Sequence, residues 1–357
     1  MAYAPSADDA HELPEKPDRI PDKTEKPKAP AHELEERGRG RHAARPTEIP
    51  AKGWLDIFAR TKQQVGEDNL DIVSAGVAFY GFVAVVPALA AVIAVYGLVS
   101  DPSEVAAQIE SLAQVLPREA LPMLHEQMLR ITSNGSAAGW SALIGFALAL
   151  YSANKATSAM ITGLNIAYDE LEHRKFFKLL AISFLLTIGA LIGAVLAVSL
   201  VAVLPSLLQR MNVTHGAELM LNLARWPILV GGFMGSLAVM YRFGPCRHDA
   251  KWVWVSPGAI VSALLWLVGS GLFSLYVSKF ASYDKTYGPL GTVVIFMMWL
   301  YLSAFVILLG AELNSEMERQ TKKDTTRGTP KPLGERGANA ADTVGPSRDE
   351  LREKKKK

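Results

Sequence analysis

A stripe of polar side chains interrupts an otherwise apolar stretch of the chain. Its members recur at steps of three and four residues and therefore share one face of a helix: Tyr151, Lys155, Ser158, Thr162 and Asn165. Asn154 lies on the flank of the same face. Polar groups at membrane depth are costly, so they either line a path for a ligand or an ion, or bond to neighbouring helices. Both interpretations stay open, and every member except Tyr151 is a candidate for a substrate path, together with Asn154.

Lys155 is the most informative member of the stripe. It lies about four helical turns beyond Trp140, where the apolar stretch has its outer end. An ammonium so far along a span either faces a ligand or an ion, or extends its flexible stem to the cytoplasmic headgroups. The first interpretation predicts that Lys155→Ala abolishes function while insertion and expression stay intact.

Charged and polar residues at the ends of other apolar stretches are candidates for gates and ion pairs. They are Asp284 and Lys285 for an outer gate, and Arg242, Glu312 and Asn314 for the inner side. Glu312 either ends its span in water or pairs with Lys155 or Arg242 from neighbouring inner ends.

The sequence lacks the ligand pattern of a metal enzyme. Of the seven histidines, three lie in the first 50 residues and three are isolated. The seventh belongs to the acidic group 169–173. This group is interpreted as a solvated loop rather than a cation site. Cys246 is the single cysteine, which excludes an intrachain disulfide. No phosphate-binding loop or nucleophile elbow occurs. We therefore expect no metal, no cofactor and no enzymatic activity.

Six intervals without a formal charge must supply the elements that position these residues: 72–100, 131–154, 179–209, 226–241, 252–278 and 286–311. A bilayer core of about 30 Å needs roughly 20 apolar residues in a helix that rises about 1.5 Å per residue. Most of the intervals exceed that length, and the fourth is the weakest. The sequence therefore predicts an all-α fold, a polytopic integral membrane bundle of six transmembrane helices.

The distribution of basic residues predicts the orientation of this bundle. Lys and Arg are denser in the connections 169–178 and 242–251, and at both flanks, than in the remaining connections. The positive-inside rule then places both termini in the cytoplasm. Residues 103–131 lie outside and have helical apolar spacing, which indicates short amphipathic helices on the outer face.

The two ends of the chain differ from its apolar middle. Residues 1–50 hold 8 of the 20 prolines, and 318–357 hold 12 Lys/Arg against 7 Asp/Glu. Such segments bury too little apolar surface to offset their ordering entropy. We expect a disordered N-terminal tail (1–50), a transmembrane domain (51–317) and a disordered basic tail (318–357). The basic tail attracts anionic headgroups, and we expect no nucleic acid as a partner.

Several motifs resemble the YihY/BrkB family of bacterial inner-membrane proteins over about residues 54–317. They are Ala75-Gly-Val-Ala-Phe-Tyr80, the stretch 154–168, Tyr287-Gly-Pro-Leu-Gly291, Trp299-Leu-Tyr-Leu-Ser303 and Gly310-Ala-Glu-Leu-Asn314. The resemblance implies a six-helix membrane fold without an agreed activity, and it adds Tyr80 to the substrate-path candidates. Some members have carried the label ribonuclease BN or virulence factor. The residues do not support the ribonuclease label, because a hydrolytic nuclease needs clustered carboxylates or histidines.

These features of the sequence are compatible with three functions. The first is non-enzymatic: transport or flipping of a lipid-like or small amphipathic substrate, or envelope maintenance. The second is a scaffold that recruits envelope proteins through 103–131 and the basic tail. The third, a ribonuclease, is remote. Membrane lipids are the expected partners, with a homo-oligomer as a further possibility.

Overall fold

The computed structural model describes residues 36, 38–99, 135–204, 215–279 and 289–354. Gly38–Lys357 form one compact unit, and Met1–Arg37 form another, of which only Glu36 is described. The described residues are helical and contain no strand. The long helices are α2 (Ala51–Glu67), α3 (Leu70–Val99), α6 (Gly135–Ala167), α7 (Phe176–Val198), α9 (His215–Phe243), α10 (Trp252–Lys279) and α12 (Pro289–Glu318). The short elements are η1 (Pro46–Glu48), η2 (Ser199–Val203), α13 (Asn339–Asp342) and α14 (Arg348–Lys354).

Among the described residues, four helices are long and apolar enough to cross a membrane. They are Phe176–Val201, Leu219–Phe243, Trp252–Ser278 and Gly291–Glu318. A fifth candidate is the bent pair of Ala51–Glu67 and Leu70–Val85, whose two halves meet at 64°. The structure thus supports four or five spans where the sequence predicts six. Helix α6 is 33 residues long but is not among them, and its second half carries the polar stripe.

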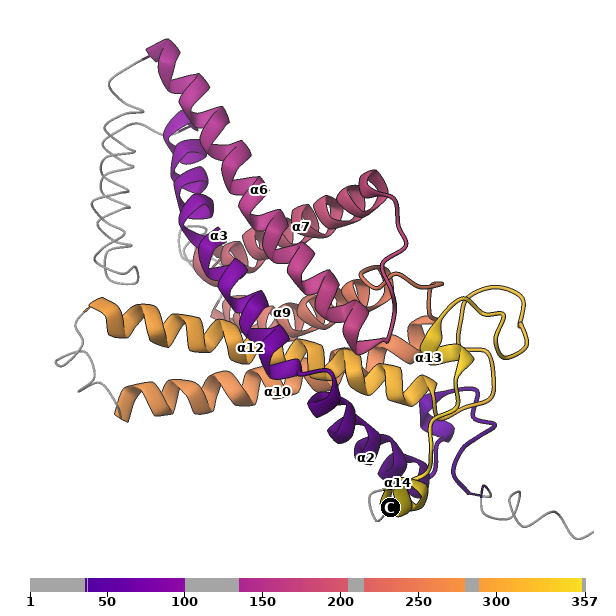
Figure 1. Ribbon diagram of the computed structural model, residues 1–357. Coiled ribbons are helices and arrows are strands. Elements are labelled where there is room, and N and C mark those ends of the chain that lie inside the picture. Colours follow the sequence, from indigo (N-terminus) through magenta and orange to yellow (C-terminus); the bar gives the residue numbers. More distant parts are fainter. Residues whose placement is uncertain (1–35, 37, 100–134, 205–214, 280–288, 355–357) are drawn as a thin grey trace, which may run out of the picture. The chain divides into compact units, whose positions relative to one another are not determined.

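The apolar core lies where five long helices converge. Its members come from α3, α6, α9, α10 and α12 or from the connections beside them, and the fully buried ones include Leu70, Leu164, Tyr168, Val255 and Leu308. Helices α10 and α12 run alongside each other, as do α3 and α6 (Figure 1). This arrangement brings the ends of α3, α6 and α12 together at one end of the core.

Close helix packing is found at Gly258 and Gly310 and not at every pair of helical glycines. A Cβ on Gly189, Gly193, Gly231 or Gly235 meets no described atom within 4 Å. On Gly258, by contrast, a Cβ would lie 2.2 Å from the main-chain oxygen of Gly310. Only a residue without a side chain permits this approach of α10 to α12.

Residues 319–354 are folded over the polar end of the bundle, which differs from the disordered tail expected from composition. Arg336 is buried, and its guanidinium donates to the main-chain oxygens of Lys322, Lys323, Lys331 and Ala341. Residues 38–50, expected in the disordered N-terminal tail, include the buried side chains of Arg41, Ala43 and Ile49. Hydrogen bonds to backbone carbonyls hold these segments in place. A hydropathy profile of the sequence does not reveal such bonds.

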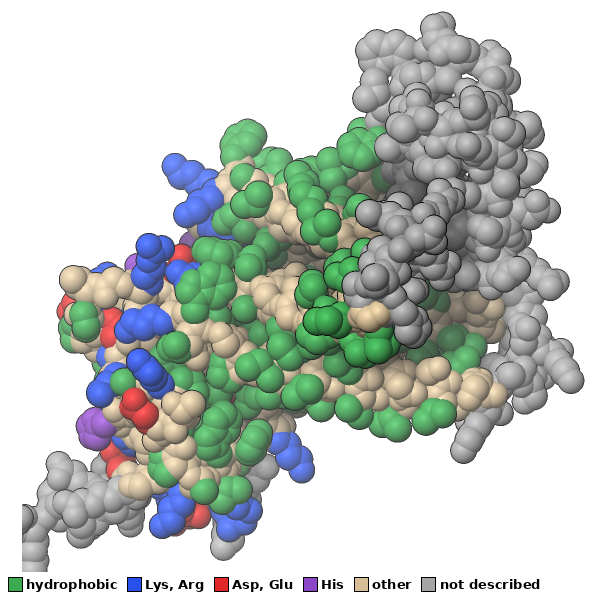
Figure 2. All heavy atoms as spheres, turned by 180° about the vertical axis from the view of Figure 1, so that it is seen from behind, with side chains coloured by type: hydrophobic (Ala, Val, Ile, Leu, Met, Phe, Trp, Pro, Cys, Tyr) green, Lys and Arg blue, Asp and Glu red, His purple; other side chains and the backbone are tan. Residues whose placement is uncertain are grey.

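Charged side chains gather at one end of the described part of the chain. Figure 2 shows Lys, Arg, Asp and Glu at that end, beside a broad surface of hydrophobic side chains. The same end carries the connections 169–175 and 244–251 and the segment 319–354. The expected outer helices at 103–131 lie outside the described residues.

Candidate functional site

One side of the polar stripe binds helix α7. Asn154 donates to the Ser183 hydroxyl at 2.5 Å, and the hydroxyls of Ser158 and Ser183 are 3.0 Å apart. One turn further along, Thr187 donates to the hydroxyl of Thr157 at 2.8 Å. Asn154 and Ser183 are buried. These contacts match the interpretation in which the stripe bonds to a neighbouring helix.

The other side of the stripe is exposed. The Lys155 ammonium lies 5.3 Å from the centre of the Tyr151 ring and forms no ion pair with a described residue. Thr162 is also exposed and bonds to the main-chain oxygen of Ser158. Tyr80 of α3 is 44 % exposed. The candidates therefore divide into a bonded side with Asn154 and Ser158, and an open side with Lys155 and Thr162.

Asn165 joins two connections at the charged end. Its side chain accepts from the main-chain N–H of Cys246 at 2.7 Å and donates to Glu172 at 3.0 Å. Arg174 binds Glu172 and also the main-chain oxygen of Gly244. The hydrogen bond from Arg174 lowers the pKa of Glu172 to about 2. The group expected to be a solvated loop thus ties the α6–α7 connection to the α9–α10 connection.

Arg242 is buried against the Trp252 ring, with its guanidinium carbon 4.4 Å from the ring centre. Its ion-pair partner is Asp249, at 3.9 Å. Of the two alternatives for Glu312, the ion pair with Arg242 or Lys155 is not formed among the described residues, and Arg242 is engaged in the α9–α10 connection. Asp284 and Lys285, the expected outer gate, lie outside the described residues.

Asn314 joins α12 to the proline-containing turn of α10. Its side-chain oxygen accepts from the N–H of Gly258 at 2.8 Å, and its nitrogen donates to the Val255 oxygen at 3.1 Å. Pro257, between these residues, has no N–H and disturbs the helical ladder. Asn314 satisfies backbone groups on both sides of the disturbance, so its role in the structure is to hold α10.

Glu312 lies in an acidic cluster at the ends of α3, α6 and α12. It is 1 % exposed, and its Oε2 atom has no hydrogen-bond partner among the described residues. The carboxyl of Asp68 is within hydrogen-bonding reach of Glu312, and its Oδ2 atom also lacks a partner. Burial, followed by the nearby carboxylate of Asp169, raises the pKa of Asp68 to about 6. The hydroxyl of Tyr168 is buried as well and has no hydrogen-bond partner within the part of the chain that the structure describes.

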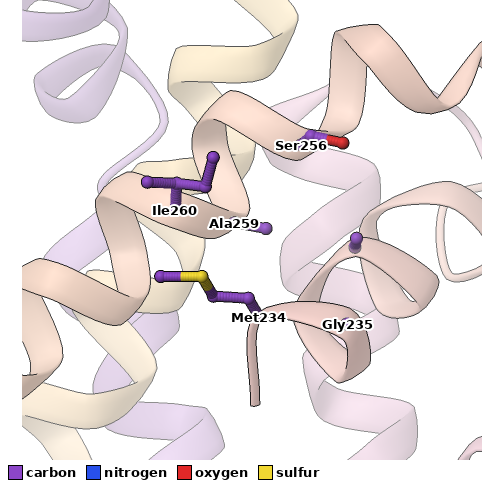
Figure 3. Close-up of a pocket in the computed structure, with 6 residues that line it drawn as sticks. Met234, Gly235, Ser256, Ala259 and Ile260 are labelled. Atoms are coloured by element: carbon purple, nitrogen blue, oxygen red, sulfur yellow. The ribbon is translucent and has the colours of Figure 1, made fainter. Parts of the chain in front are cut away.

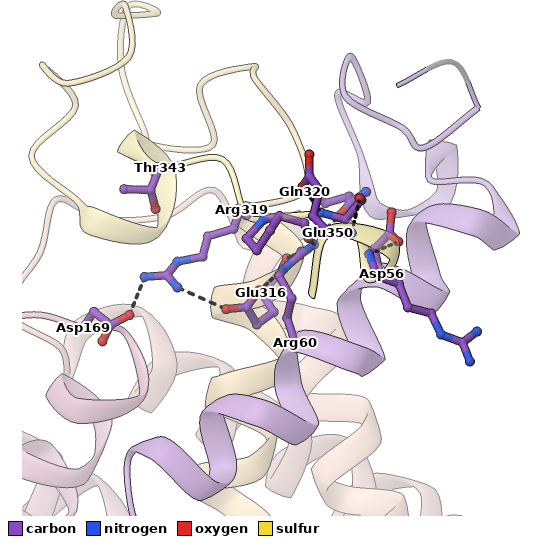
Figure 4. A network of polar contacts seen from close by, with 12 residues as sticks. Asp56, Arg60, Asp169, Glu316, Arg319, Gln320, Thr343 and Glu350 are labelled. Atoms are coloured by element: carbon purple, nitrogen blue, oxygen red, sulfur yellow. Dashed lines mark hydrogen bonds and ion pairs between the residues drawn. The ribbon is translucent and has the colours of Figure 1, made fainter. Parts of the chain in front are cut away.

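Two arginines neutralise the remaining acids of this cluster. Figure 4 shows the Arg319 guanidinium between Asp169 and Glu316, both of which it binds. Arg60 of α2 binds Glu316 and also the side chain of Gln320. Asp68 and Glu312 form no ion pair with any described residue. They are therefore the two acids of the cluster that lack a cation of their own.

Sequence reasoning missed Asp68, Arg60 and Arg319. One signal existed, because the Asp68-Asn69 dipeptide is typical of a helix break, and Asn69 has a left-handed backbone with φ of 49°. The break separates α2 from α3. No local pattern indicates that Asp68 and Glu312 meet, since their contact joins distant parts of the chain.

A further concave feature of the described residues is small and apolar. A groove of about 160 Å³ between α9 and α10 is lined by Met234, Gly235, Ala238, Ser256, Ala259 and Ile260 (Figure 3). It offers one hydroxyl, that of Ser256, which bonds to the main-chain oxygen of Trp252. Among the described residues, no group of three His, Cys, Asp or Glu is arranged to hold a metal ion.

Comparisons with known proteins agree with a membrane bundle. The ribonuclease-like protein YfkH of Bacillus subtilis is 31 % identical over 216 residues, which are 59 % of this chain and 77 % of YfkH. The UPF0761 membrane protein IL2447 of Idiomarina loihiensis is 30 % identical over 58 % of this chain and 73 % of its own length. The UPF0761 membrane protein Smlt0865 of Stenotrophomonas maltophilia is 40 % identical over 37 % of this chain and 30 % of its own.

No solved structure matches the chain. The profile of the family described as Virulence factor BrkB matches residues 61–333, most of the chain. With its helices apolar enough to span a membrane and its relatives named as membrane proteins, the chain belongs to the BrkB family of membrane proteins.

Proposed function

We propose that this protein is a non-enzymatic transporter or flippase of the bacterial inner membrane. Its substrate is lipid-like or a small amphipathic molecule. In this proposal the chain crosses the membrane six times within residues 51–317, with both ends in the cytoplasm. The gathering of charged side chains at one end of the described chain supports this orientation (Figure 2).

The exposed Lys155 carries the proposal. It lies 12 residues before the end of α6 at Ala167, or about 18 Å along the helix, which is comparable with half of a bilayer core of about 30 Å. An ammonium at that depth requires a water-filled path or an anionic partner. No described residue supplies a carboxylate. A substrate with an anionic headgroup provides the missing charge, and Tyr151 and Thr162 add polar groups on the same side.

An enzymatic role receives less support. The words ribonuclease-like belong to YfkH, whose identity to this chain is low. The acids that the structure brings together are held by Arg60 and Arg319 or lie buried as a pair. None of them is arranged with a histidine as a general base would require.

One observation favours a second candidate, a scaffold for envelope proteins. Residues 319–354 form an ordered segment on the charged end, and the stretch 327–335 is exposed in most of its residues. An ordered surface recruits partners at a smaller entropic cost than a disordered tail. This candidate predicts that the purified protein carries other proteins rather than a small ligand.

Native mass spectrometry of the protein in lipid particles distinguishes the two. We expect a stoichiometric lipid or metabolite in the wild type that Lys155→Ala loses and Lys155→Arg keeps. Lys178→Ala serves as the matched control, because Lys178 is also exposed but lies in the first turn of α7. If the protein instead carries bound partner proteins and no small ligand, the result supports the scaffold.

A vesicle assay then tests movement of the substrate. The protein is reconstituted with fluorescent phosphatidylglycerol, and the loss of outer-leaflet fluorescence on chemical quenching reports flipping. Removal of a charge-assisted contact worth about 1.5–3 kcal/mol lowers the rate by roughly tenfold or more in Lys155→Ala. Equal rates for wild type and Lys155→Ala contradict the assignment of Lys155 to the path.

A further inference from the structure

Two carboxyl groups from different elements meet at the charged end of the bundle without a cation. Glu312 belongs to α12 and Asp68 to the junction of α2 and α3. Each retains a carboxyl oxygen without a hydrogen-bond partner among the described residues. Glu312 is almost fully buried, and Asp68 is half-buried. The pair therefore has spare acceptor capacity in a largely buried place.

The charges around the pair do not neutralise it. Those that act on it are Glu67 at the end of α2, Asp169 after α6, and Glu316 and Arg319 at the end of α12. Arg319 is bound to Asp169 and Glu316, and Arg60 of α2 is bound to Glu316. Two titratable groups belong to α9 and the connection to α10. Tyr241 bonds to Ser262, and Arg247 is bound to Glu318. Every cation in the surroundings is engaged by another carboxylate.

Two carboxylates in contact cannot both stay ionised in a buried site at low cost, and sharing one proton removes the repulsion. We propose that Asp68 and Glu312 bind one proton between them and that this proton is the coupling ion of the transport proposed above. The second half of this inference rests on the proposed function. The first half, the proton site, stands on the burial of Glu312, the unpartnered oxygens of both carboxyls and their proximity, and does not depend on transport.

The donor set favours a proton over a metal cation. Calcium takes six to eight oxygen ligands and magnesium about six, whereas the described residues offer no group of three acidic, histidine or cysteine ligands. Because the pKa of Asp68 is raised only to about 6, Asp68 is ionised at neutral pH and the one proton of the pair stays on the buried Glu312. Asp169, whose charge acts on the pair, has 36 % of its side chain exposed and is bound to Arg319.

The position of the pair links its charge to the helices. Asp68 lies at the 64° break before α3, and α3 packs on both α6 and α12. Loss of the shared proton places two negative charges across the contact of α3 with α12, so the deprotonated state favours separation of the two helices. Lys155 lies on α6, the other helix that packs on α3. Proton binding and the substrate path therefore both involve a neighbour of helix α3.

Infrared spectroscopy of the protein in lipid discs tests the proton site. A protonated carboxyl has a C=O stretching band that ionised carboxylates lack. We expect one such band in the wild type that is still present above about pH 6, where Asp68 is ionised, and that disappears only at higher pH. Asp68→Asn removes the neighbouring charge and shifts the disappearance of this band down by about one pH unit or more, whereas Glu312→Gln removes the band above about pH 6. The double variant loses the band.

Asp71→Asn is the matched control, because Asp71 is an exposed aspartate three residues after Asp68, in the first turn of α3. Its band and titration are expected to equal those of the wild type. A band that persists in the double variant, or a titration that neither single variant shifts, overturns the shared proton. The two single changes lie on different elements, and size-exclusion profiles identify any variant that fails to fold.

The vesicle assay with fluorescent phosphatidylglycerol, repeated with and without a pH gradient, tests the coupling. We expect the gradient to change the flipping rate of the wild type by several-fold and to leave the rate of Glu312→Gln unchanged. Flipping that ignores the gradient in the wild type overturns the coupling while the proposed function stands. No flipping at all, with the infrared band intact, overturns the proposed function and leaves the proton site.

Discussion

The side chain of Asn314 accepts a hydrogen bond from the main-chain N–H of Gly258 at 2.8 Å, and this bond fixes α12 against the proline-containing turn of α10. Gly258 also lies so close to Gly310 that neither residue has space for a side chain. The contact between the two helices therefore depends on the absence of a Cβ atom at Gly258 and on the side-chain amide of Asn314. The same stretch of α12 carries Glu312, so the position of the acidic pair depends on it.

Gly258→Ala is expected to destabilise the protein. The added methyl would lie 2.2 Å from the Gly310 oxygen and 2.5 Å from Asn314, so α10 and α12 must separate. Overpacking of this kind costs about 1–3 kcal/mol. Thermal unfolding in detergent measures the loss, and Gly189→Ala, which meets no described atom within 4 Å, is expected to unfold as the wild type does. Equal melting of both variants contradicts the close contact.

Arg247 and Glu318 form a buried ion pair that ties the α9–α10 connection to the end of α12. Two hydrogen bonds join them, at 3.0 and 2.6 Å, and both side chains are at most 1 % exposed. Arg247→Met leaves the charge of Glu318 uncompensated, and such a loss costs about 3–5 kcal/mol. Arg327→Met changes an exposed arginine and is the control. Chemical unfolding of both variants measures the difference in their free energies of unfolding. Equal stability of the two variants would show that the ion pair is only peripheral.

Arg336→Ala is expected to loosen residues 319–354 without disrupting the spans. The substitution removes the donor to four main-chain oxygens within that segment. Amide hydrogen exchange there should accelerate by about tenfold or more, which corresponds to about 1.4 kcal/mol of local stability. Arg352→Ala, at an exposed position in α14, should leave the exchange unchanged. Uniform acceleration over the whole protein would argue against a local role.

The Glu172–Arg174 contact predicts a pH dependence of stability. Because the pKa of Glu172 is lowered to about 2 in the folded protein from 4.5, its contribution is complete above about pH 4.5 and disappears as the pH falls towards 2. Glu172→Gln should therefore lower the melting temperature at neutral pH and make little difference at the acid end. Melting curves over this range measure it. A difference in melting temperature between the variant and the wild type that grows as the pH falls would contradict this prediction.

The helical class and the positions of most long helices were predictable from charge-free intervals, because membrane insertion acts on residue composition. The sequence also left open two roles for the polar stripe, and the structure gives Asn154 and Ser158 hydrogen bonds to α7. Neither the fold of 319–354 nor the meeting of Asp68 with Glu312 was predictable. Both depend on contacts between distant segments, and guanidinium–carbonyl bonds such as those of Arg336 follow no sequence period.

The packing of the C-terminal segment has a consequence for the order of biosynthesis. Arg60 and Arg41 donate to the main-chain oxygens of Pro346 and Gly345, so two arginines near the start of the folded unit find part of their partners close to its end. A ribosome exposes the first long before it delivers the second. The helices can enter the membrane during translation, but the ionic layer at their ends is completed only after residue 346 has left the ribosome.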